Sequence, residues 1–235
     1  MFRAKSIDNF NVSLKIFLGL VLTIIFSKIA YTLAQLNDPI VEQGVNSWLG
    51  ILLVAGLGFL ALKLAPRVGF PDLWDKRISN RQRFIIPMLV GIAFGIGQII
   101  LVSLVLALKI PMVAFPLAVP VYLSGGILME MVFHLIPVVL LVWFLANVLL
   151  KQQWQEQVFW VVAVLLSLLE PVAQTVGLYK MGIISSPVLA AILFSFIFAA
   201  NLVPLYLFRQ YGFLAPITWR LSNYLIWHII WPIIF

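Results

Sequence analysis

The chain has 235 residues, of which 63% are hydrophobic and only 10% are charged, and its mean hydropathy is +1.12. A soluble domain is roughly half apolar and a quarter charged, so this composition excludes a soluble protein and predicts an integral membrane protein. The formal charge of +7 is attributed to basic cytoplasmic loops and not to a nucleic-acid partner, and the lack of cysteine excludes disulfide and thiolate chemistry.

Apolar stretches of about 20 residues recur along the chain, and each is long enough to cross a hydrocarbon core about 30 Å thick as a helix. The stretches are continuous rather than alternating, which favours helices over a β-barrel. We therefore predict an all-α, polytopic bundle that forms a single transmembrane domain over residues 1–235. The predicted spans, seven in number, are 12–34, 47–65, 84–108, 120–148, 158–178, 187–207 and 215–234.

The first span has a basic leader but no small-residue cleavage pattern, so we predict a retained helix, with Lys28 close enough to its end to reach the membrane surface. Basic residues gather at alternate span ends, which places the N-terminus in the cytoplasm of a multi-pass cell-membrane protein. The first external loop, "QLNDPIVEQGVN", has acids and no Lys or Arg, as this orientation requires. These cytoplasmic basic residues are Arg3, Lys5, Lys15, Lys63, Arg67, Lys76, Arg77, Arg81, Arg83, Lys151 and Arg209.

Three further patterns concern the membrane surface, helix packing and helix kinks. The charged segment 66–84 contains Trp74 and Phe84, and we predict a helix or hairpin that lies at the headgroup level. The small residues of "GIAFGIG" (91–97) and "SGG" (124–126) predict close helix approaches. Prolines inside the spans predict kinks. They are Pro137, Pro171, Pro204 and Pro232.

Ionisable side chains inside the spans are the candidate functional residues, because such groups are costly in hydrocarbon and face the bundle interior or a wet cavity. Helical spacing places Glu130 with His134 on one face, Glu170 with Gln174 on a second, and a stripe on the last span. We predict that these three segments converge at one depth on a shared water-accessible pocket. The stripe consists of Arg220, Tyr224 and His228.

Charge arithmetic leaves three hypotheses for this polar set. The two acids Glu130 and Glu170 exceed the single permanent cation Arg220, so one negative charge needs a proton or a metal ion. One hypothesis is a structural ion network in which either carboxylate pairs with Arg220. Another is a catalytic water site with a buried Glu as base. The third is a metal or proton site, with zinc as a possible ion and His134, His228 and Glu130 as the candidate ligands.

The order of features resembles the CAAX prenyl protease and bacteriocin-processing (CPBP, or Abi) family of intramembrane proteases over residues 66–228. That family has E-E-x-x-x-R on one helix, F-x-x-x-H on a later one, and H-x-x-x-N on a late helix after a lead-in of the type G-x-L-x-A-P-I. Here "MEMVFHL" (129–135), "LSLLEP" (166–171) and "YGFLAPITWRLSNY" (211–224) stand at those places.

The chain departs from the family motifs at their functional positions. Met129 replaces the first acid, whose family role is thought to be water activation, and Glu130 keeps the second. The other replacements are His134 for the Arg, Glu170 and Arg220 for the two His, and Tyr224 for the Asn. Glu170 and Arg220 are complementary in sign, so the resemblance implies a former hydrolytic site refilled by a salt bridge between them.

Three functions therefore remain open. The main hypothesis is a catalytically degenerate or repurposed relative of these proteases with a buried polar chamber. An alternative is an active intramembrane endopeptidase with Glu130 as base, Arg220, Tyr224 and His228 at the oxyanion, and His134 or His228 as proton carrier. A further alternative is a noncatalytic scaffold that binds another membrane protein. Expected partners are the lipid bilayer and a peptide or membrane protein, with no nucleic acid.

Overall fold

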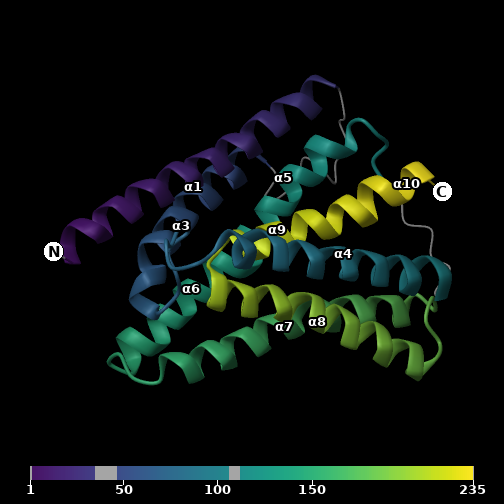
Figure 1. Ribbon diagram of the computed structural model, residues 1–235. Helices are drawn as coiled ribbons and strands as arrows, with labels where there is room; N and C mark the ends of the chain where they lie inside the picture. Colours follow the sequence, from purple (N-terminus) through teal and green to yellow (C-terminus); the bar gives the residue numbers. More distant parts are fainter. Residues whose placement is uncertain (1, 35–46, 106–111, 235) are drawn as a thin grey trace.

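The computed structural model describes residues 2–34, 47–105 and 112–234, and within these ranges the chain is helical and contains no strand (Figure 1). The predicted external loop 35–46 lies outside the described residues. The helical elements are α1 (Phe2–Leu33), α3 (Trp48–Leu64), η2 (Ala65–Val68), η3 (Arg81–Ile85), α4 (Ile86–Gln98), η4 (Ile99–Val105), α5 (Ala118–Glu130), η5 (Met131–Leu135), α6 (Ile136–Val142), η6 (Trp143–Leu149), α7 (Gln155–Lys180), α8 (Pro187–Tyr211), α9 (Leu214–Tyr224), η7 (Leu225–Ile230) and α10 (Trp231–Ile234).

Six helical runs in the described ranges are long and apolar enough to cross a membrane. They correspond to the first six predicted spans, which confirms a multi-pass helical bundle. The last predicted span is also helical, as α9, η7 and α10, but it is not among the six because polar side chains interrupt its apolar sequence. The six runs are Asn11–Leu33, Trp48–Val68, Arg81–Val102, Ala118–Leu149, Gln155–Lys180 and Pro187–Tyr211.

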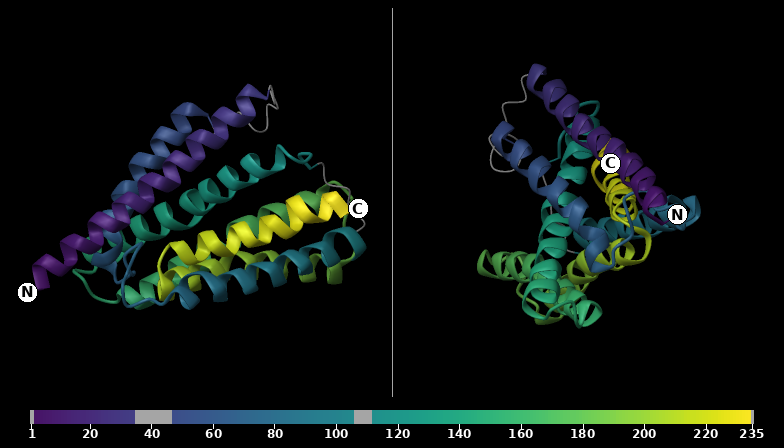
Figure 2. Two further views of the ribbon diagram at one scale, coloured as in Figure 1. Left: turned by 45° about the horizontal axis from the view of Figure 1, so that its top comes forward. Right: turned by 90° about the vertical axis from the view of Figure 1, so that its left-hand side faces the viewer.

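The arrangement of the helices explains why the last run tolerates polar residues. Helices α1 and α3 form one side of the bundle, where α1 packs on α5 and α3 packs on α6 (Figures 1 and 2). On the other side α7 packs against α6 and α8, and α9 packs against α4, α5 and α8. Because α9 has neighbours on three sides, its polar face meets protein instead of lipid.

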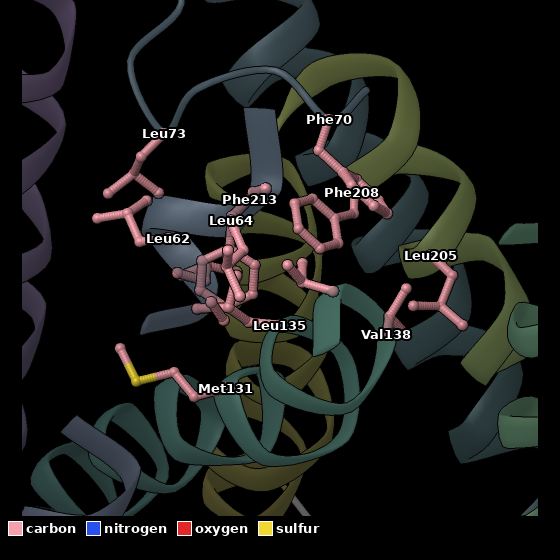
Figure 3. Packing of buried hydrophobic residues seen from close by; sticks show 14 of the residues in the cluster. Leu62, Leu64, Phe70, Leu73, Met131, Leu135, Val138, Leu205, Phe208 and Phe213 are labelled. Atoms are coloured by element: carbon pink, nitrogen blue, oxygen red, sulfur yellow. The ribbon is translucent and has the colours of Figure 1, made fainter. Parts of the chain in front are cut away.

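Buried apolar side chains from many segments close the end of the bundle where the 65–73 segment folds back (Figure 3). Phe70 from this segment stacks on Phe208 of α8, with ring centroids 4.4 Å apart. Leu135 and Val138 of the α5–η5–α6 run are fully buried in the same cluster. This cluster fixes the α5–α6 run against α8 and thereby sets the position of the polar residues next to it.

The charged segment 66–84 packs on the protein more closely than the sequence predicted. The Trp74 backbone N–H donates to Ser13 Oγ at 3.0 Å, and the Arg83 guanidinium lies 4.0 Å above the Trp74 ring. Arg83 is only 2% exposed and donates to the backbone oxygens of Asp75 and Ile78. Residues 69–79 therefore form an irregular loop held to the bundle, not the predicted helix or hairpin, and the position at the headgroup level stays a prediction.

Three prolines directly follow wide helical turns. In the π-helical turn η5 the Ile136 N–H donates to the Met131 oxygen, five residues back, and Pro137 comes next. The same order holds for η3 before Pro87 and for η7 before Pro232. A proline ring lacks the N–H and clashes with the carbonyl four residues back, so a widened turn accommodates it.

Glycines allow α4 and α5 to approach α9 closely, as the small-residue motifs predicted. A methyl group at Gly91 would collide with the Trp219 carbonyl, and one at Gly95 would lie 2.8 Å from Ile226 Cβ. On α5, a methyl group at Gly126 would lie 2.9 Å from Leu221 Cδ2. Only glycine fits at Gly91, where the clash is with backbone, whereas at Gly126 the end of the Leu221 side chain would have to shift.

Candidate functional site

Glu130 is the centre of a buried ion group. Its Oε2 lies 2.6 Å from His134 Nδ1, one helical turn along the same run, and its Oε1 accepts a hydrogen bond of 2.7 Å from Arg220 Nε of α9. The side chains of Glu130, His134 and Arg220 are 0%, 2% and 13% exposed. Each carboxylate oxygen of Glu130 thus has a nitrogen partner, and no part of the carboxylate reaches solvent or lipid.

Local sequence explains why α5 and α9 bring these groups together. Glu130 ends α5, and the π-helical turn that follows it carries His134. One turn before Glu130, Gly126 faces α9, where an added methyl group would be in ordinary contact with Arg220 Cγ at 3.5 Å. The Arg220 side chain thus passes beside Gly126 on its way to Glu130.

The predicted salt bridge between Glu170 and Arg220 is wrong. Glu170 instead accepts a hydrogen bond of 2.7 Å from Gln174 Nε2 on its own helix, and Arg220 pairs with Glu130. The reason is the packing of α7, which lies against α6 and α8, whereas α5 packs directly on α9. The general prediction of an ion network that includes one carboxylate and Arg220 is confirmed, with Glu130 as the partner.

A cavity of about 670 Å³ lies between α4, α7, α8 and the α9–η7 run. Four of the predicted site residues line it, namely Glu170, Arg220, Tyr224 and His228. Glu130 and His134 are not part of its wall and lie behind Arg220. The predicted convergence on one pocket therefore holds for the residues of α7 and of the last run, while the pair on the α5–η5 run forms a separate buried layer.

The cavity wall also contains three amide side chains that the sequence analysis did not consider: Gln98, Asn201 and Asn223. Asn201 Nδ2 donates to the Ile197 carbonyl at 2.9 Å, and Asn223 Nδ2 lies 3.5 Å from Gln98 Oε1. These amides carry no charge and so fall outside the set of ionisable side chains, but their position inside the predicted spans is visible in the sequence.

Trp219 supplies an unpaired donor at the same wall. It lines the cavity and is 1% exposed, and its Nε1 has no hydrogen-bond partner among the described residues. The adjacent Arg220 guanidinium carbon lies 4.9 Å from the Trp219 ring centroid. The unpaired indole N–H is enclosed by protein and is not open to the cavity, whereas the Arg220 side chain is 13% exposed.

His228 belongs to an aromatic stack. Its ring lies 4.0 Å from the Tyr122 ring at an interplanar angle of 16°, and Tyr224 meets both rings nearly edge-on. His228 Nδ1 also lies 3.2 Å from Met112 Sδ. These contacts hold the ring against α5 and the segment before it, so His228 contacts neither Glu130 nor His134 in the way that the predicted metal site requires.

The three candidate metal ligands do not form one site. Within residues 2–34, 47–105 and 112–234, no three His, Asp or Glu side chains lie close enough together to hold a metal ion. Glu130 and His134 also use their facing atoms to bind each other, and Arg220 takes the second carboxylate oxygen. A zinc site built from Glu130, His134 and His228 therefore does not fit this geometry.

The helical fold, the apolar runs and the intramembrane polar cavity define the class of this chain as a multi-pass α-helical membrane protein. Comparison with protein-family models found no match, and comparisons with curated proteins and with solved structures found none either.

Proposed function

We propose that this chain is a noncatalytic binding protein of the cell membrane, a repurposed relative of the CPBP proteases whose intramembrane chamber holds a ligand and does not hydrolyse one. In this proposal the last helical run is a seventh span and the N-terminus is cytoplasmic. The N-terminal orientation follows from the basic residues at alternate span ends. Burial of the polar face of α9 against three neighbours supports the seventh span.

The observation that carries the proposal is the state of Glu130. A general base must lie within hydrogen-bond reach of the proton that it removes. Both oxygens of Glu130 already have nitrogen partners, at 2.6 Å and 2.7 Å, and the side chain is fully buried behind the cavity wall. Glu130 is therefore a structural counter-ion for Arg220.

The rival hypothesis of an active endopeptidase has one observation in its favour. Glu170 lies on the cavity wall, next to a region that also contains Arg220 and Tyr224. Its Oε1 is bonded to Gln174, but the carboxylate is not shielded from the cavity as that of Glu130 is. If hydrolysis occurs, Glu170 rather than Glu130 is the carboxylate placed to activate water.

A cleavage assay separates these functions. The purified protein in lipid nanodiscs is incubated with a library of membrane-anchored peptides, and the products are analysed by mass spectrometry. We expect no cleavage above that of empty nanodiscs. Cleavage by the wild-type protein that disappears in Glu170→Gln, with the fold preserved by circular dichroism, would overturn the proposal. Glu156→Gln is the control for loss of a carboxylate on the same helix outside the cavity, where Glu156 pairs with Arg209.

A further inference from the structure

We infer that the cavity binds the headgroup of a zwitterionic phospholipid with a primary ammonium, its phosphate at Arg220 and its ammonium at Glu170. This inference rests on the proposed binding function and adds the chemical class of the ligand. Three features of the cavity carry it: the unused terminal nitrogens of Arg220, a carboxylate without a described cation at ion-pair distance, and an apolar part of the wall.

The donors are at the α9 wall. Arg220 uses Nε for Glu130, and its terminal nitrogens donate to no other side chain among the described residues. A phosphate group is a fitting acceptor, because the two unesterified oxygens of a phosphodiester can accept from the two terminal nitrogens of a guanidinium.

The carboxylate is at the α7 wall. The Glu130 charge is balanced by Arg220, so Glu170 remains as the carboxylate of the cavity without a cation at ion-pair distance in the described part of the chain. Its Oε1 accepts from Gln174, and the Asn201 amide donates to a backbone carbonyl, which leaves Glu170 Oε2 and Asn201 Oδ1 as acceptors. A primary ammonium has three N–H donors and a charge opposite to that of Glu170.

Part of the remaining wall is apolar, beside the amides Gln98, Gln174 and Asn223. Leu178 and Leu193 line the cavity towards the α7–α8 connection. Apart from Gln174, the exposed side chains of α7 next to Glu170 are apolar, as expected for a surface that faces hydrocarbon. A ligand that enters past this surface comes from the bilayer, and its acyl chains remain beside these apolar residues.

The arrangement also predicts headgroup selectivity. An ethanolamine headgroup brings one negative and one positive charge, so it adds no net charge to the cavity. A glycerol headgroup would bring its phosphate to the same wall without a cation for Glu170. A choline headgroup has a cation that donates no conventional N–H hydrogen bond to Glu170 or Asn201. The expected order of affinity is ethanolamine, then choline, then glycerol.

Native mass spectrometry of the detergent-purified protein tests this inference with phosphatidylethanolamine, phosphatidylcholine and phosphatidylglycerol of identical acyl chains in competition. We expect Glu170→Gln to reduce the preference for ethanolamine over glycerol lipid by about tenfold, because loss of one charge-assisted hydrogen bond lowers affinity by about that factor. Glu156→Gln should bind as the wild type does.

Equal retention of the three lipids, or an ethanolamine preference that survives Glu170→Gln, would overturn the inference. The lipid assay and the cleavage assay test the two proposals independently. Peptide hydrolysis lost in Glu170→Gln overturns the noncatalytic function, whereas an absence of both hydrolysis and lipid preference overturns the ligand assignment alone.

Discussion

Glu130 and Glu170 are both carboxylates inside predicted spans, yet the structure places them in opposite situations. Glu130 is fully buried and held by two nitrogen partners from two helical runs, whereas Glu170 lies on a cavity wall and bonds only to Gln174 of its own helix among the described residues. A charged side chain in a membrane bundle can therefore be structural or available for a ligand. The number of partners that neighbouring helices supply determines which of the two it is.

The largest effect is expected from Glu130→Gln, which leaves the Arg220 guanidinium without its counter-ion. We expect a loss of about 3–5 kcal/mol in the free energy of unfolding, because removing one charge of a buried pair leaves the other charge buried without a counter-ion. Denaturation of the purified protein in mixed micelles, followed by circular dichroism, measures it. The double variant Glu130→Gln/Arg220→Leu should regain part of the loss, since it removes both charges. If Glu130→Gln is as stable as the wild type, the structural role of Glu130 is wrong.

The next effect tests the helix crossing that brings Arg220 to Glu130. Gly91 contacts the backbone of Trp219, the residue before Arg220, so Gly91→Ala should force α4 and α9 apart. We expect a loss of about 1–3 kcal/mol, the usual cost of overpacking. Gly125→Ala is the control, because a methyl group there meets nothing within 4 Å. The same unfolding assay applies, and equal stability of the two variants would contradict the role of this crossing.

A loop carboxylate outside the spans gives a reference for a solvated ion pair. The Arg77 side chain, which hydrogen-bonds Asp75, holds the pKa of Asp75 below its usual range. Asp75 therefore stabilises the fold above its unfolded pKa of about 3.9, and this contribution is lost as the pH falls through the lower folded value. Since Arg77 is 84% exposed, the contribution is at most about 1 kcal/mol.

The measurement for this pair is the thermal unfolding midpoint from pH 6 down to pH 3. Asp75→Asn should be less stable than the wild type at the upper end, and the difference should shrink towards the acid end. Asp72 is the control, because its pKa is shifted in the opposite direction. Burial and then the nearby Asp75 raise its pKa, so its ionisation opposes folding and Asp72→Asn should remove a cost present at neutral pH. A difference for Asp75→Asn that grows as the pH falls would contradict the assignment.

The smallest effect on stability is expected from Glu170→Gln. A glutamine retains an oxygen that can accept from Gln174, and no described cation loses an ion pair. We expect a change below about 1 kcal/mol, the range of a solvated polar contact. The unfolding assay used for Glu130→Gln compares the two variants directly. A loss for Glu170→Gln as large as that for Glu130→Gln would remove the distinction between the two carboxylates.

Much of the fold was predictable because the bilayer requires long apolar helices whose backbone groups bond internally. The six predicted spans that became apolar runs, and the glycine motif of α4, follow from this constraint and from local sequence. The loop 66–84 was harder, because Arg83 and Trp74 pack on each other through contacts that no periodic pattern encodes.

The candidate site was predictable only in part. Sequence spacing correctly placed Glu130 beside His134, since helical neighbours are fixed by local geometry. The amides Gln98, Asn201 and Asn223 come from three helices, and their common cavity depends on how those helices pack. Their residue types were visible in the sequence, but their association was not.

By itself the sequence determined that this protein is a helical membrane bundle with a few intramembrane charges, because composition and helical periodicity are local properties of the chain. Only the tertiary structure decided which carboxylate neutralises Arg220 and which one faces the cavity. That choice depends on α5 packing on α9 while α7 packs on α6 and α8. Contacts between distant segments are set by the fit of whole helix surfaces, which no single stretch of sequence contains.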